Sequence, residues 1–70
     1  MKNSIREKRT SLHITQEELS ELLRVSRQTI ISLEKGKYNP SLVLAHKLAQ
    51  LFDCRIEDLF TFEGEENIDG

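Results

Sequence analysis

The segment 27–35 carries four side chains whose chemistry matches the edges of DNA base pairs: Arg27, Gln28, Ile31 and Ser32. An arginine can bond guanine, a glutamine can bond adenine, a serine can bond either, and an isoleucine can contact the thymine methyl group. All four face outward if the segment is a helix that turns its remaining apolar residues inward, and no acidic residue lies among them. A purely structural surface would more often carry pairs of Glu and Lys. The pattern therefore favours a face that enters a major groove.

Polar and basic side chains flank this segment and suit contacts to DNA phosphates: Gln16, Ser26, Thr29, Lys35, Lys37, Tyr38 and Asn39. Gln16 would add an amide donor to the positive N-terminus of the helix that it begins. Two of these residues have a structural alternative. For Gln16 it is ordinary solvent exposure, and for Tyr38 it is packing against the turn at Pro40.

Helix start and stop signals divide the chain into five segments. The capping-box pattern, a hydroxyl residue followed three positions later by Glu, occurs at Ser4 and again at Thr15. Ser26 and Ser41 are further N-cap residues. Apolar residues then recur at helical spacing, in the fourth segment at Leu42, Ala45, Leu48, Ala49 and Phe52. We predict helices over residues 5–12, 16–23, 27–35, 42–52 and 56–60.

Only three residues, 24–26, join the second and third predicted helices, which indicates a sharp turn of the helix-turn-helix type. The turn has the small residue that close helix crossing needs (Ser20) and an apolar residue to fill the corner (Val25). Ile30 and Leu33 anchor the second helix. Arg24 stands where a positive φ usually favours glycine, at a cost of about 1 kcal/mol.

Length and composition indicate one small domain over residues 1–62 followed by an acidic tail over 63–70. The net charge of −2 hides two unlike parts. Residues 1–37 hold eight Lys and Arg against five Asp and Glu, a balance of +3, whereas residues 38–70 hold two against seven, a balance of −5. An anionic partner is drawn to the first part.

Other classes of protein find little support in the residue types. Cys54, His13 and His46 do not have zinc-ligand spacing, and no acid–base constellation or glycine-rich phosphate loop is present, so neither an enzyme nor a cofactor or metal site is expected. Cys54 is better interpreted as a small buried apolar residue. The N-terminal residues lack the apolar run of a signal peptide, and we expect a cytoplasmic protein with no membrane span.

A surplus of apolar residues around the fourth and fifth helices predicts a homodimer contact through Leu51, Ile56, Phe60 and Phe62. Residues 61–63 could form a short edge strand that pairs across this dimer. The alternative is a core that extends further around the fourth helix.

Residues 5–60 resemble the Cro/C1-type helix-turn-helix family of regulators, also called the xenobiotic response element family. The resemblance is carried by residues 15–19, 25–30 and 33–42, which read TQEEL, VSRQTI and LEKGKYNPSL. It implies an all-α, compact, five-helix, lambda-repressor-like fold whose third helix enters the major groove of a double-stranded operator. The family binds palindromic operators as dimers, so a transcriptional regulator, and more specifically a repressor, is expected.

The resemblance also implies roles for individual residues. Arg27, Gln28 and Ser32 occupy base-reading positions, and Gln16 occupies a phosphate-binding one. Arg9 and Glu34 match a pair that forms a partly buried ion pair between the first and third helices.

Three residues depart from the family pattern. His13 and Arg24 replace glycines, and Arg55 replaces a Ser or Thr cap. The alternative function is a protein-interaction module or an antitoxin built on the same fold.

Overall fold

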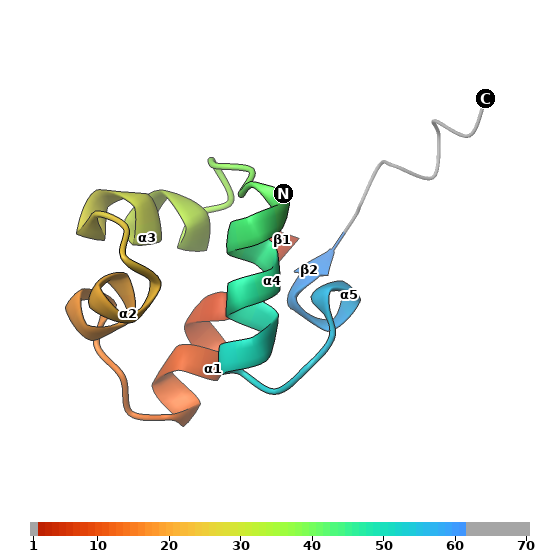
Figure 1. Cartoon of the computed structure of the whole chain (residues 1–70), viewed down its shortest axis with the longest axis horizontal. Coiled ribbons are helices and arrows are strands. Elements are labelled where there is room, and N and C mark those ends of the chain that lie inside the picture. The colour runs from red at the N-terminus through yellow and green to blue at the C-terminus, as the bar shows by residue number, and fades with distance from the viewer. Residues whose placement is uncertain (1, 62–70) are drawn as a thin grey trace.

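The computed structural model describes residues 2–61. In chain order they form β1 (Lys2–Asn3), α1 (Ile5–Ser11), α2 (Gln16–Leu23), α3 (Arg27–Glu34), α4 (Leu42–Leu51), α5 (Ile56–Leu59) and β2 (Phe60–Thr61) (Figure 1). The predicted all-α, five-helix fold is confirmed, with helix ends that differ from the predicted ones by at most one residue. The predicted domain boundary at residue 62 and the tail 63–70 lie outside the described residues.

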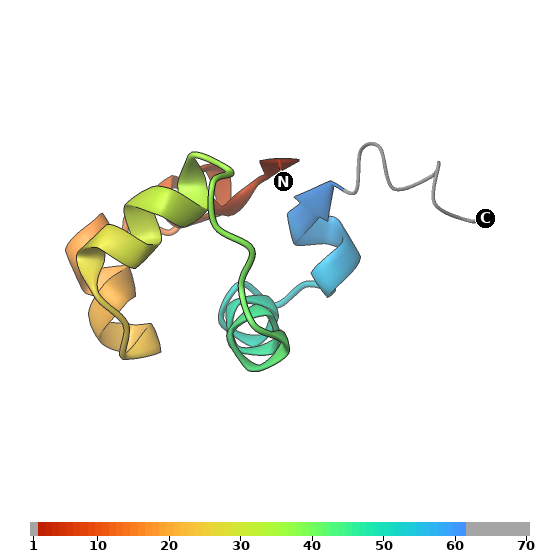
Figure 2. The ribbon, with the colours of Figure 1, turned by 90° about the horizontal axis from the view of Figure 1, so that it is seen from above.

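The five helices share one hydrophobic core, to which each contributes at least one side chain. Six residues are fully buried: Ile5, Leu19, Ile30, Leu33, Leu48 and Leu59. The views in Figures 1 and 2 place α2 and α3 together at one end of the molecule, with α4 beside them and α5 beyond it. The pair formed by α2 and α3 thus packs against the core on its inner side.

The apolar face of α4 differs from the predicted one. Leu42, expected on the packing face, is 79% exposed, and Leu44 takes a place in the core at 7% exposure. Val43 is also exposed. Three consecutive apolar residues begin this helix, so their order alone does not say which of them faces inward.

Side-chain caps begin α2, α3 and α4 as predicted. Thr15 Oγ1 accepts from the Glu18 amide at 3.0 Å while the Glu18 carboxylate accepts from the Thr15 amide at 2.8 Å, which is a complete capping box. Ser26 and Ser41 accept from the amides three residues further on. These bonds satisfy amides that have no partner within their helices.

The capping box predicted at Ser4 is wrong. The Ser4 side chain makes no cap bond, and its hydroxyl donates instead to the Asp58 carbonyl at 3.2 Å. The Asn3 carboxamide oxygen accepts from the Ile5 amide at 3.1 Å and takes over part of the capping role. The cause is tertiary, because the Ser4 amide is bonded to the Leu59 carbonyl and thereby holds this residue against α5.

The first four helices all end in the same way: a residue of positive φ comes just after the helix, and two backbone hydrogen bonds link it and the next residue to the last turn. The four residues are His13 (φ 60°), Arg24 (φ 59°), Gly36 (φ 76°) and Asp53 (φ 54°). In each case the amide of the positive-φ residue donates to the carbonyl three residues earlier, and the amide of the next residue donates to the carbonyl five residues earlier. This is the Schellman pattern. The residue that follows is Ile14, Val25 or Cys54 in three of the four cases, and these side chains pack against the core.

The strand predicted to pair across a dimer is wrong for its described part. β2 pairs antiparallel with β1 of the same chain, with Lys2 opposite Thr61 and Asn3 opposite Phe60 (Figures 1 and 2). Residues 62 and 63 lie outside the described residues. The N-terminal strand thus already supplies the backbone partner that a second subunit was expected to provide.

Candidate nucleic-acid interface

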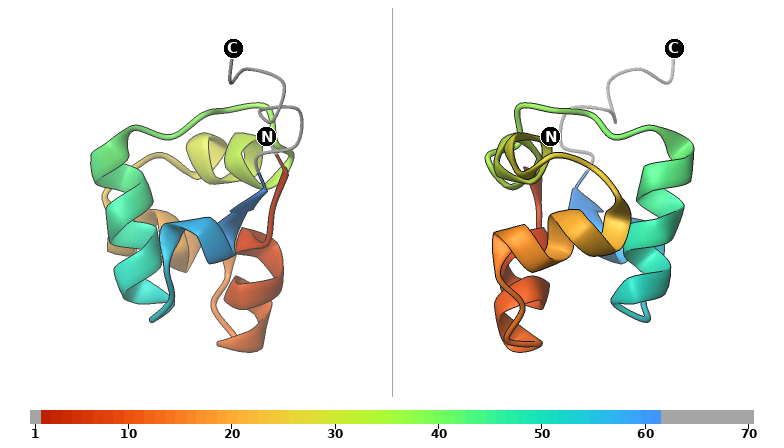
Figure 3. Two further views of the ribbon diagram at one scale, coloured as in Figure 1. Left: turned by 90° about the vertical axis from the view of Figure 1, so that its right-hand side faces the viewer. Right: turned by 60° about the vertical axis from the view of Figure 1, so that its left-hand side comes forward.

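A tight turn sets α3 across α2 and leaves the outer side of α3 uncovered (Figure 3). Arg24 lies in the left-handed region, and the Val25 amide donates to the Ser20 carbonyl at 3.0 Å. Ser20 is buried at 6% exposure, as the small residue at the helix crossing should be, and its hydroxyl donates to the Glu17 carbonyl. These features define a helix-turn-helix.

The outward side of α3 carries the four predicted base-contacting residues. Ile30 and Leu33 are fully buried, which turns the opposite side of the helix to solvent. Arg27 and Gln28 are exposed, and Ile31 and Ser32 are half-buried. The four therefore lie on one accessible face of α3, and their side chains are of the types that contact base edges.

The predicted phosphate-contacting residues lie at both ends of that face. Ser26 and Thr29 are at the start of α3, where their hydroxyl oxygens are 2.9 Å apart and bond each other. After α3, the exposed residues Lys35, Lys37, Tyr38 and Asn39 follow. Figure 3 shows the connection from α3 to α4, which contains the last three, running over the top of the molecule. Tyr38 is 42% exposed, so much of its side chain is open to solvent.

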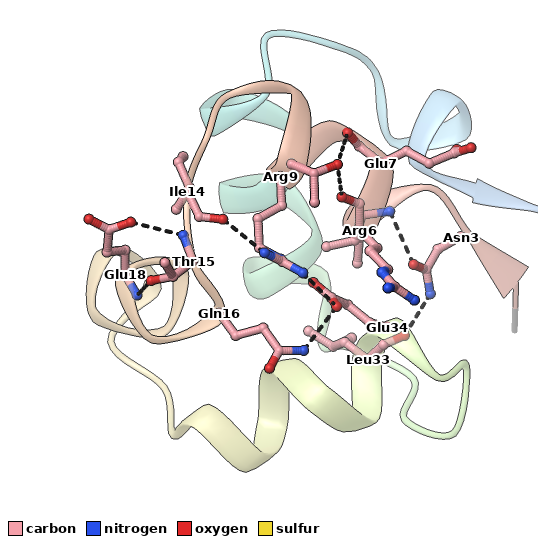
Figure 4. Close-up of polar contacts among 12 residues, drawn as sticks. Asn3, Arg6, Glu7, Arg9, Ile14, Thr15, Gln16, Glu18, Leu33 and Glu34 are labelled. Atoms are coloured by element: carbon pink, nitrogen blue, oxygen red, sulfur yellow. Dashed lines mark hydrogen bonds and ion pairs between the residues drawn. The ribbon is translucent and has the colours of Figure 1, made fainter.

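An ion pair ties α1 to the end of α3. Arg9 Nε donates to Glu34 Oε2 at 2.6 Å and Arg9 Nη2 donates to Glu34 Oε1 at 3.3 Å (Figure 4). The two side chains are only 11% and 6% exposed. Arg9 Nη1 also donates to the Ile14 carbonyl at 2.8 Å, so one guanidinium links α1, the α1–α2 turn and α3.

Gln16 belongs to the same network. Its Nε2 atom donates to Glu34 Oε1 at 3.1 Å, so its amide is held by α3 as well as by α2 (Figure 4). The side-chain amide nitrogen of a glutamine carries two hydrogens, and the bond to Glu34 uses one of them. Gln16 is thus half-buried and ordered by a partner, in contrast to the fully solvated alternative.

Asn3 fixes the other side of α3. Its Nδ2 atom donates to the Leu33 carbonyl at 2.7 Å, which brings β1 against the last turn of α3 (Figure 4). No local sequence pattern indicates this contact, because its partner lies 30 positions away. None indicates a role for Arg6 either, which lines a surface hollow together with Gln16 and Lys35.

The residues predicted to form a dimer contact differ in how deeply they are buried in their own chain. Leu51 and Ile56 are half-buried against the core. Phe60 is only 4% exposed and belongs to the core of its own chain, so the interface predicted for its side chain is wrong. Phe62 lies outside the described residues. On α4, Leu44 and Ala45 are buried in the core, while Leu42 and Val43 stay exposed.

Neither a metal-binding cluster nor a membrane-crossing helix is present within residues 2–61. No group of three or more His, Cys, Asp and Glu residues in this part of the chain is arranged to hold an ion. The helices of the same region are too short and too polar to span a bilayer.

Comparisons with known proteins agree with this geometry. The family model described as helix-turn-helix matches residues 5–59. The chain therefore belongs to the Cro/C1-type helix-turn-helix family, and it is a helix-turn-helix transcriptional regulator.

Similar proteins come from archaea and bacteria. An uncharacterized HTH-type transcriptional regulator of Archaeoglobus fulgidus is 58% identical over 66 residues, which cover 94% of each chain. The regulator YgzD of Bacillus subtilis is 46% identical over 67 residues, covering 96% of this chain and 100% of that one. The CTXphi transcriptional repressor RstR of Vibrio cholerae is 33% identical, with 96% of this chain and 60% of RstR covered.

A solved structure has the same fold. The restriction-modification controller protein C.AhdI of Aeromonas hydrophila aligns with a TM-score of 0.70 and 38% identity, covering 80% of this chain and 85% of that one.

Proposed function

We propose that this regulator binds double-stranded DNA sequence-specifically, with α3 in the major groove. The observation that carries the proposal is the outward face of α3, where Arg27, Gln28, Ile31 and Ser32 are accessible and no acidic residue intervenes. Arginine and glutamine in this position each offer a two-bond contact to one purine, worth about 1 to 3 kcal/mol of discrimination.

Contacts to the DNA backbone would hold α3 in register. Gln16 would contribute its remaining amide hydrogen, and the segment after α3 would contribute Lys35, Lys37, Tyr38 and Asn39. Ser26 and Thr29 would present hydroxyl groups at the start of the helix. Contacts of this kind position the protein and carry little sequence information, so they add affinity for all sequences alike.

The operator we propose is a palindrome bound by a homodimer, with half-site centres about one helical turn apart. Apolar residues on α4 and α5 support self-association, because Leu42 and Val43 are exposed and Leu51 and Ile56 are half-buried. We propose repression as the outcome, since binding to an operator by a small domain blocks other proteins from that DNA. The similar RstR is described as a repressor.

A pair of glutamine substitutions tests the proposal. We expect Gln28→Ala to weaken binding to the preferred sequence by about 1 to 3 kcal/mol and to relax the base preference at one position per half-site. Gln16→Ala should weaken binding to preferred and random duplexes by the same factor. Gln50→Ala, at an exposed glutamine of α4, is the matched control and should change neither.

Quantitative binding to both duplexes at one fixed salt concentration measures these effects. Equal losses on preferred and random DNA from both Gln28→Ala and Gln16→Ala would contradict base reading by α3. Binding of a second small protein in place of DNA would instead favour the interaction module.

A further inference from the structure

A surface hollow of about 380 Å³ lies between α1, the start of α2 and the end of α3. Six residues line it: Arg6, Arg9, Gln16, Ile31, Glu34 and Lys35. Three of these side chains are cationic and one is anionic, so the hollow has a formal charge of +2 (three minus one). A net positive hollow on the surface of a regulator suits an anionic ligand.

The single carboxylate in the hollow is already neutralised. Glu34 accepts two bonds from Arg9 and a third from Gln16, and its side chain is 6% exposed. The charges of Arg9 and Glu34 therefore compensate each other, and neither is available to a ligand in the hollow. The positive charge that remains comes from Arg6 and Lys35.

Arg6 is placed to use its charge on a ligand. It is exposed, and its guanidinium forms no ion pair with any residue in the described part of the chain. Figure 4 shows the guanidinium extending from α1 toward the end of α3, on the side of Leu33 and Glu34. A guanidinium offers several donors in one plane, which matches the oxygens of a phosphate.

The hollow is continuous with the proposed base-contacting face. Ile31 both lines the hollow and belongs to that face, and Lys35 follows α3 directly. Gln16, which also lines the hollow, is the first residue of α2. In helix-turn-helix complexes the first helix of the motif crosses the DNA backbone, so a duplex that receives α3 would bring a backbone strand close to the start of α2.

We propose that Arg6, Gln16 and Lys35 together bind one backbone phosphate of DNA in this hollow. Arg6 supplies a charged, two-bond contact from α1, outside the helix-turn-helix itself, and Glu34 holds the Gln16 amide so that its second hydrogen faces the ligand. The inference rests on the proposed DNA binding and adds a contact from a different helix.

Neutralising Arg6 tests this site. We expect Arg6→Gln to weaken binding three- to tenfold on preferred and random duplexes alike, and to lower the slope of log K against log salt by about 0.9, the value for one phosphate contact. Arg6→Lys should retain most of the slope, because the charge remains. Lys47→Gln, which removes one exposed charge from α4, is the control and should leave the slope unchanged.

Two outcomes separate failure of this site from failure of the proposed function. If the unaltered protein binds DNA and Arg6→Gln behaves like Lys47→Gln between 50 and 200 mM salt, the phosphate site is refuted and DNA binding stands. If the unaltered protein shows no preferred sequence and no salt dependence, both proposals fall. Circular dichroism of each variant confirms that the fold is intact.

Discussion

Removing the charge of Glu34 tests the ion pair that joins α1 to α3. In the variant Glu34→Gln, the Arg9 side chain, which is only 11% exposed in the unaltered protein, loses its carboxylate partner. Breaking one side of a buried pair costs about 3 to 5 kcal/mol, because a charge is left without compensation. A domain of this length has a total free energy of unfolding of about 4 to 10 kcal/mol. We therefore expect the variant to lose about half of its stability or more.

The double variant Arg9→Met with Glu34→Leu separates the effect of an unpaired buried charge from the effect of replacing the two side chains. Both ions are then absent, so no charge stays buried, and replacing such a pair by apolar residues is often close to neutral. The bonds that Arg9 makes to the Ile14 carbonyl and that Glu34 accepts from Gln16 are lost as well. We expect the double variant to be less destabilised than Glu34→Gln alone.

Urea denaturation followed by circular dichroism gives the free energy of unfolding of each variant. A loss below about 1 kcal/mol for Glu34→Gln would show that the pair behaves as a surface ion pair. A double variant whose loss equals the sum of the losses of Arg9→Met and Glu34→Leu, each measured alone, would show that the two residues do not interact. Either result would contradict a stabilising buried ion pair between Arg9 and Glu34.

Three further predictions concern turns, caps and assembly. Arg24→Gly should raise the free energy of unfolding by about 1 kcal/mol, because the φ of 59° at Arg24 suits glycine. The control Lys8→Gly, inside α1, should lower the free energy of unfolding by about the same amount. A lower melting temperature for Arg24→Gly would contradict this prediction. Asn3→Ala should lower the free energy of unfolding, measured by urea denaturation, by about 1 to 2 kcal/mol, and Ser4→Ala should lower it clearly less. A larger loss for Ser4→Ala than for Asn3→Ala would indicate that Ser4 is the cap of α1. Ile56→Ala should weaken the proposed homodimer in sedimentation equilibrium, and an unchanged dissociation constant would place the contact elsewhere.

Local signals predicted α2, α3 and α4 well because each of these helices carries its own start and stop. Thr15, Ser26 and Ser41 cap their helices with bonds that span three residues, and such bonds depend on the local sequence alone. The turn after α2 is equally local, since a positive φ at Arg24 follows from the short connection to α3. The buried positions of Ile30 and Leu33 then determine which side of α3 is the proposed base-contacting face.

Contacts between distant segments could not be predicted in the same way. The Ser4 hydroxyl bonds the Asp58 carbonyl, which lies 54 positions away, so its loss as a cap depends on where α5 packs. Phe60 enters the core because β2 pairs with β1, and no local pattern at either end of the chain indicates that pairing. The bond from Gln16 to Glu34 likewise exists only once α2 and α3 have packed.

Selection of bound sequences from a random pool of DNA duplexes is the most direct test of base reading by α3. We expect an enriched inverted repeat whose half-site centres are about one helical turn apart, with a purine contacted by Arg27 or Gln28 in each half-site. A pool that shows no enriched motif after repeated selection, although the protein is folded, would contradict base reading by α3.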